Sequence, residues 1–170
     1  MTAHRVRVGP RVARAALLAG GALALWPAAP GSTGARTVAI YAPRAAGTDC
    51  ARVYPLTRRV VGPRVLRRTL EALLAGPTRN ERARGYGGWF SARTAGHLRD
   101  VRIVRGVAYV DFRSFAHDIP NASSSCGSTL LLAQLDRTAK QFATVERTVY
   151  SFNGSPRAFY EWLQREPPAP

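Results

Sequence analysis

Residues 62–77 read GPRVLRRTLEALLAGP, and this stretch decides the fold because it predicts a helix with clear ends. Pro63 is tolerated in a first helical turn, and Gly76-Pro77 supplies the residues that commonly end a helix. Arginines occupy one face, where Arg67 and Glu71 form an i,i+4 pair. The opposite face is formed at helical spacing by Val65, Leu66, Thr69, Leu70, Leu73 and Leu74.

Extended segments are predicted on both sides of this helix from short apolar runs bounded by glycine and proline. They are residues 38–41, 52–61, 101–104, 107–112 and 145–152. Pro55 places the second of them at a sheet edge or at a break, because proline cannot donate to a strand ladder. Arg105-Gly106 predicts a two-residue hairpin turn, and Asn153-Gly154 closes the last strand with a turn.

Two further helices complete the order of elements. Residues 123–125 are serines that can cap the first of them. Its stripe is Leu131, Leu135, Thr138 and Phe142. Ser155-Pro156 starts a short last helix, and Pro167-Pro168 ends it. The order β-β-α-β-β-α-β-α predicts an α+β fold, in which two main helices pack on one face of a small mixed β-sheet and a short C-terminal helix follows.

Residues 1–35 have the three regions of a secretory signal: a basic start, the apolar run Ala15 to Trp26, and a stretch of small residues that ends at Ala35. The apolar run is shorter than the roughly 20 residues that a membrane-spanning helix needs. We therefore expect an exported protein of the cell envelope or the medium that begins near Arg36, with a retained N-terminal anchor as the alternative. The small-residue stretch holds no cysteine, which argues against a lipoprotein.

Cys50 and Cys126 are the only cysteines. Export would permit a disulfide between them, and the alternatives are two free buried thiols or a metal site. The isolated His97 and His117 lack the paired spacing that zinc sites use. We therefore expect a disulfide, no metal and no cofactor.

The composition is strongly basic, with 25 basic residues against 10 acidic ones and a net charge of +15. Lys140 is the only lysine, and this arginine bias indicates a GC-rich genome. Loss of the four arginines of the signal would lower the charge by four, to +11, so the mature chain stays basic. Such a charge suits an acidic wall polymer or an anionic membrane surface, whereas export makes nucleic acid a poor candidate.

The segment 77–98 is predicted to be a long loop in which arginines lie beside aromatic residues. Guanidinium and aromatic groups together suit binding to phosphate, sugar or a protein hot spot. The candidate binding loop therefore comprises Arg79, Arg82, Arg84, Tyr86, Trp89, Phe90 and Arg93. In the alternative, Trp89 and Phe90 fold back into the core and the arginines are only solvated.

The sequence does not favour a catalytic site. Residues 123–128, with His117 and Asp118 upstream, offer serines and a base, but no G-x-S-x-G elbow is present. Helix capping explains the serines, and surface or capping roles explain Asp111 and Asp118. We therefore assign no catalytic residue.

Three segments together resemble the GerMN domain family of sporulation and spore germination proteins. The helix-to-loop signature is matched by Leu70–Thr78 with Glu81 and Gly85, the central strand by Gly106–Phe112, and the second helix and final strand by Leu132–Leu135 with Phe142, Val145 and Val149. The Cys50/Cys126 pair and the last helix lie outside the family pattern.

The resemblance implies a compact module of exported or membrane-anchored bacterial envelope proteins, similar to ring-building domains and without established catalytic residues. It divides the chain into a signal (1–35), an N-terminal extension with the first strand (36–51), a GerMN-like domain (52–154) and a C-terminal helix with its tail (155–170). The expected function is a non-enzymatic interaction or assembly module with a protein partner of the envelope. The alternatives are a binder of anionic wall or membrane polymers through its arginines and, third, an envelope hydrolase. The sequence leaves the oligomeric state open.

Overall fold

The computed structural model describes residues 34–44 and 49–168. All the elements below lie in one compact unit within Gly31–Pro170. The predicted secretory signal, with its alternative of a retained anchor, lies outside the described residues except for its last two positions. Within the described part, no helix has the length and apolar character needed to cross a membrane.

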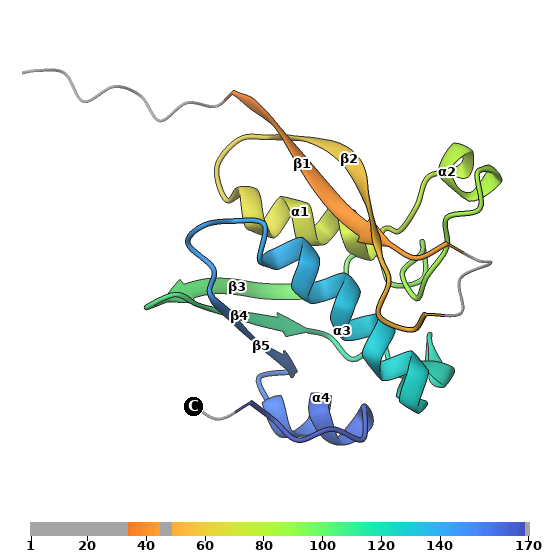
Figure 1. The fold of residues 1–170 in the computed structure, drawn as a ribbon. Helices are drawn as coiled ribbons and strands as arrows, with labels where there is room; N and C mark the ends of the chain where they lie inside the picture. The colour runs from red at the N-terminus through yellow and green to blue at the C-terminus, as the bar shows by residue number, and fades with distance from the viewer. Residues whose placement is uncertain (1–33, 45–48, 169–170) are drawn as a thin grey trace, which may run out of the picture. The chain divides into compact units, whose positions relative to one another are not determined.

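Strands β1 (Ala35–Ala42) and β2 (Tyr54–Val61) form an antiparallel two-stranded ribbon (Figure 1). Alternate side chains of the ribbon are buried, with Ile40 directly opposite Leu56. Pro55 therefore lies in a strand that has one partner, as its missing N–H requires.

A second sheet contains β3 (Leu98–Val104), β4 (Val107–Phe112) and β5 (Arg147–Phe152) in that order. The β3–β4 pair is antiparallel and the β4–β5 pair is parallel, so the sheet is mixed. Arg105 and Gly106 join β3 to β4 with φ values of 46° and 77°, the positive angles that a type I′ turn demands.

Helices α1 (Val65–Leu74) and α3 (Ser125–Ala139) lie between the ribbon and the three-stranded sheet, and α4 (Pro156–Trp162) packs at the end of β5 (Figure 1). Two short helical segments are α2 (Arg79–Ala83) and the 3₁₀ turn η1 (Pro120–Ser123). Ser124 caps α3 by accepting from the Gly127 N–H, and Ser155 caps α4 by accepting from the Ala158 N–H.

The α+β class, the mixed sheet and the order of the main elements are confirmed, but the five strands form two sheets rather than one. Side chains of α3 and of Gln141, in the turn that follows α3, explain the separation. Gln141 exchanges two hydrogen bonds with the backbone of Ala39, and the Tyr41 backbone donates to Thr138 and accepts from Gln134. Because these side chains satisfy this edge of β1, no second strand is needed there.

Candidate binding surface

The segment after α1 contains the short helix α2, which the sequence analysis treated as loop. Its N-terminus is a capping box: the Thr78 hydroxyl accepts from the Glu81 N–H at 3.3 Å, and the Glu81 carboxylate accepts from the Thr78 N–H at 2.7 Å. The same carboxylate accepts two hydrogen bonds from Arg58 of β2, at 2.6 and 2.7 Å. These contacts fix α2 to the ribbon.

Glu81 is nearly enclosed, with 7% of its surface exposed. The hydrogen bond with Arg58 lowers the pKa of Glu81 from 4.5 to about 2, with further lowering from the Thr78 backbone, although burial acts in the opposite direction. Glu81 is therefore ionised at neutral pH and neutralises Arg58, which removes that arginine from the set available to an anionic partner.

Trp89 and Phe90, the two large aromatics of the candidate loop, turn inward. Phe90 is 2% exposed and meets Phe115 edge-to-face at 6.1 Å between ring centroids. The Trp89 indole N–H donates to the Gly127 carbonyl at 3.0 Å, and the Trp89 backbone N–H donates to Gln134. Phe90 therefore does not belong to an exposed binding surface, and Trp89 joins the loop to α3.

The arginines of the candidate loop remain exposed but do not act as one group. They are Arg79, Arg82, Arg84 and Arg93. Arg82 donates back to the Pro77 carbonyl, whereas Arg84 lies over the ring of Tyr86, 5.8 Å from its centroid. Tyr86 and Arg84 are thus the members of the loop that the structure brings together.

These two residues continue into a row that also includes the open end of the ribbon. We name it the arginine–tyrosine array, and its members in spatial order are Arg52, Tyr54, Arg44, Tyr86 and Arg84. The Arg44 guanidinium lies between two rings, 5.6 Å from the centroid of Tyr54 and 4.9 Å from that of Tyr86. Arg52 lies 5.7 Å from the Tyr54 centroid. The three arginines are exposed and the two tyrosines are half-buried.

Backbone contacts hold the array together. Arg44 and Tyr86 form an antiparallel bridge, Gly87 N–H donates to the Pro43 carbonyl at 3.0 Å, and Arg44 also donates to the Tyr86 hydroxyl at 3.2 Å. The disulfide between Cys50 and Cys126 joins the connection between β1 and β2 to the first turn of α3. Cys50 lies two positions before Arg52, so this bond restrains Arg52, whereas the bridge to Tyr86 holds Arg44.

The array carries a local excess of positive charge. None of the ion pairs found among residues 34–44 and 49–168 includes Arg44, Arg52 or Arg84. Guanidinium groups stay protonated at every physiological pH and present planar forks of N–H donors. The array can therefore bind anionic groups by charge-assisted hydrogen bonds.

The residues considered for catalysis have structural contacts instead. Ser124 caps α3, the Ser123 hydroxyl donates to the Pro120 carbonyl, and Asp118 lies 3.7 Å from the His97 ring. Asp111 accepts from Ser151 and from the Gly154 N–H, and it pairs with an arginine of β3. Across the described ranges, no three His, Cys, Asp or Glu residues gather as a metal site would require.

A polar cluster at β5 is likewise part of the fold. Asp136 of α3 accepts from the Tyr150 hydroxyl at 2.7 Å and from the Thr148 hydroxyl at 2.8 Å. Burial raises the pKa of Tyr150 well above 10, and the charge of Asp136 adds to that effect. Tyr150 is therefore a permanent hydrogen-bond donor that joins α3 to the sheet.

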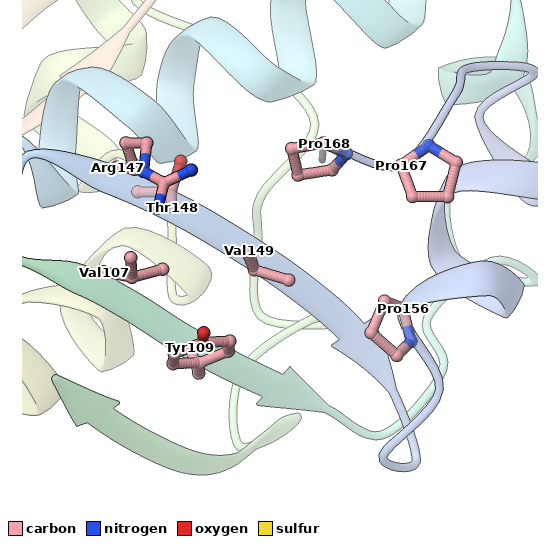
Figure 2. Close-up of a pocket in the computed structure, with 8 residues that line it drawn as sticks. All are labelled: Val107, Tyr109, Arg147, Thr148, Val149, Pro156, Pro167 and Pro168. Atoms are coloured by element: carbon pink, nitrogen blue, oxygen red, sulfur yellow. The ribbon is translucent and has the colours of Figure 1, made fainter. Parts of the chain in front are cut away.

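A mostly apolar pocket of about 220 Å³ opens on the face of the three-stranded sheet away from α1 and α3 (Figure 2). Strands β4 and β5 form its floor, and α4 and the C-terminal segment form its rim. Its lining residues are Val107, Tyr109, Arg147, Thr148, Val149, Pro156, Pro167 and Pro168. The strands alternate, so the floor residues Val107 and Tyr109 face away from the core.

Sequence reasoning found two members of the array and missed Arg44, Arg52 and Tyr54. A partial signal existed, because Arg52 and Tyr54 are two residues apart at the start of a strand and so share one face. The approach of Arg44 to Tyr86 had no local signal, since the two residues are 42 positions apart. The apolar pocket gave no signal either, because its lining comes from four separate elements.

Comparisons with known proteins identify the relatives of this chain. The model of the family Germane, described as "Sporulation and spore germination", matches residues 39–158. The structure of the tandem GerMN domains of the sporulation protein GerM from Bacillus subtilis superposes with a TM-score of 0.51 at 16% identity, covering 76% of this chain and 43% of that one. The chain thus spans less than half the length of that protein. The predicted resemblance and the fold are confirmed.

A putative lipoprotein from Clostridium perfringens gives a TM-score of 0.34 at 11% identity, covering 75% of this chain and 81% of that one. No curated protein matches this chain significantly.

Proposed function

Since the chain belongs to the sporulation and spore germination family Germane, we propose that it serves a sporulation- or germination-related process of the cell envelope as a non-catalytic interaction module. The expected export and the envelope location form part of this proposal. The module acts by surface complementarity with a partner, and its fold supplies a rigid platform for the contact.

The arginine–tyrosine array is the observation that carries the proposal. It presents three exposed guanidinium groups from two connected segments, and each is held beside a tyrosine ring. Arginine and tyrosine are the residue types over-represented at binding hot spots. Groups held in place before binding also lose less conformational entropy when a partner arrives.

The test compares the wild-type protein with an array variant that carries Arg44→Gln, Arg52→Gln and Arg84→Gln. A matched control carries Arg59→Gln, Arg68→Gln and Arg137→Gln, which removes the same charge from exposed arginines outside the array. Each full-length protein is crosslinked in the native envelope, and the crosslinked species are compared by mass spectrometry.

We expect the wild type and the control to yield a shared, defined set of crosslinked species that the array variant loses. Capture that is the same for all three proteins would refute a role for the array in binding. Capture lost equally in the array variant and the control would show attraction by net charge alone, and would also refute it.

A further inference from the structure

We propose that the arginine–tyrosine array binds a linear polyol phosphate, that is, a polymer whose backbone carries repeated phosphodiester groups and no nucleobases. This inference rests on the proposed function, because it names the partner of the same surface. Four properties of the array lead to it: the occupied ring faces, the spacing of the charges, the position of the exposed apolar residues and the restraint of the segments.

The tyrosine rings of the array are already in contact with cations. Tyr54 has the guanidinium groups of Arg44 and Arg52 over its ring, and Tyr86 has those of Arg44 and Arg84. Contacts with two guanidinium groups each make these rings poor platforms for a nucleic-acid base or for an apolar side chain of a protein. What the array offers a ligand is a set of N–H donors with positive charge.

The charges of the array alternate with the tyrosine rings along a chain of contacts. Two tyrosine rings separate the three guanidinium groups, and every guanidinium carbon lies 4.9–5.8 Å from a ring centroid. A series of separated cations matches a chain of separated anions better than it matches one compact anion. Phosphodiester oxygens suit the planar fork of arginine, which can bond two oxygens at once.

The apolar residues exposed on the described surface lie elsewhere. Val61 is 58% exposed at the end of β2, while Tyr54, the member of the array in this strand, lies at its other end. Ile103 and Val104 belong to the end of β3. Peripheral proteins hold a bilayer surface with apolar side chains as well as charge, so the array favours a hydrophilic polymer over a lipid surface.

The segments that carry the array are restrained on both sides. The bridge between Arg44 and Tyr86 and the disulfide of Cys50 limit their motion. Long arginine side chains lose rotamer freedom when they bind, and stacking on a ring removes part of that loss in advance. The array is therefore organised before the polymer arrives.

The experiment measures the binding of synthetic poly(glycerol phosphate) to the full-length protein by titration calorimetry at physiological ionic strength. Charges farther than about 8 Å from the ligand are screened under these conditions. We expect the array variant to bind at least about tenfold more weakly than the wild type, and the control triple to lose less than about threefold. Equal losses would overturn the proposal.

A charge-preserving variant separates geometry from charge. Arg44→Lys, Arg52→Lys and Arg84→Lys keep the positive charges but remove the planar forks. We expect binding about threefold or more weaker than that of the wild type. Wild-type affinity in this variant would overturn the assignment of the array as a built site. If a triple variant does not unfold cooperatively on heating, the single variants Arg44→Gln and Arg44→Lys replace it.

Competing ligand classes are tested with defined probes. Poly-L-glutamate, oligothymidylate and phosphatidylglycerol vesicles are each expected to bind more weakly than poly(glycerol phosphate), and tighter binding of any of them would overturn the ligand class. If poly(glycerol phosphate) fails to bind while array-dependent crosslinking persists, the ligand assignment fails and the proposed function stands. If neither the binding of poly(glycerol phosphate) nor the crosslinking depends on the array, the ligand assignment and the proposed function both fail.

Discussion

At the scale of single residues, Glu81 joins β2 to α2, because its carboxylate accepts from the side chain of Arg58 and from the backbone of Thr78. A buried carboxylate without its partner would be strongly unfavourable, and the same holds for Arg58 without Glu81. The pair therefore stabilises the junction of β2 and α2 only while both members are charged.

Glu81→Gln should lower the free energy of unfolding by about 3 kcal/mol at pH 7, because it leaves Arg58, whose side chain is only 15% exposed, without a counter-charge. The folded-state pKa of Glu81 is depressed from 4.5 to about 2, so the stability it contributes is present above pH 4.5 and is lost as the pH falls towards 2. Urea denaturation of wild type and variant over this pH range measures the difference between their free energies of unfolding, which should become smaller as the pH falls.

Glu71→Gln is the matched control for this prediction. Glu71 pairs with Arg67 at 3.0 Å on the surface of α1, with 40% of its side chain exposed. Exposed pairs contribute little, so this variant should lose less than about 0.5 kcal/mol. A similar loss in the two variants would show that burial of the Arg58–Glu81 pair has no special effect.

At the scale of the elements, Gly76 sets the exit from α1 towards the candidate loop. Its φ of +75° ends the helix, and a Cβ placed there would collide with the carbonyl of Phe90. Phe90 is held in the core, so its backbone has little room to move. The glycine therefore serves both the turn and the close approach of two backbone segments.

Gly76→Ala should lower the free energy of unfolding by roughly 3 kcal/mol or more, because it combines a left-handed conformation with a backbone collision. Gly85→Ala is the control, since Gly85 has a similar φ of +82° and no atom lies within 4 Å of its added Cβ. Only the conformational strain remains there, about 1 kcal/mol. Thermal and urea unfolding measure both losses, and equal losses would contradict the predicted collision.

The elements also show what local sequence could predict. Features that depend on residues a few positions apart could be predicted from the sequence. They are the termini of α1, the caps of α3 and α4, and the turn at Gly106. Helix α2 could have been predicted in the same way from the capping-box spacing of Thr78 and Glu81, but the sequence analysis treated this segment as loop. The separation of the two sheets could not be predicted in this way, because it depends on side chains of α3 and of the turn after it, which bond β1 from 93 to 102 positions away.

At the scale of the whole molecule, the array depends on contacts between distant segments. Pro43 and Arg44, just after β1, meet Tyr86 and Gly87, which follow α2, and the disulfide ties Cys50 to α3. The sequence indicated arginine and aromatic residues in one loop, but tertiary packing decides which aromatics face the solvent. Phe90, a predicted member of the binding surface, packs in the core, and Tyr54, which was not predicted, belongs to the array.

The disulfide therefore links the stability of the molecule to its binding surface. Cys50→Ser with Cys126→Ser opens a loop of 76 positions, which should lower the free energy of unfolding by about 4 kcal/mol and release Arg52 from the restraint at Cys50. Binding of poly(glycerol phosphate) should weaken by about threefold or more, because the array must then be ordered by the ligand.

Wild-type protein that is reduced and alkylated should show the same losses of stability and affinity as the double variant. Its intact mass should show two alkylated thiols only after reduction. Unchanged affinity in a folded double variant would mean that the backbone bridge between Arg44 and Tyr86 suffices to hold the array, so the disulfide would then stabilise the fold without organising the binding surface.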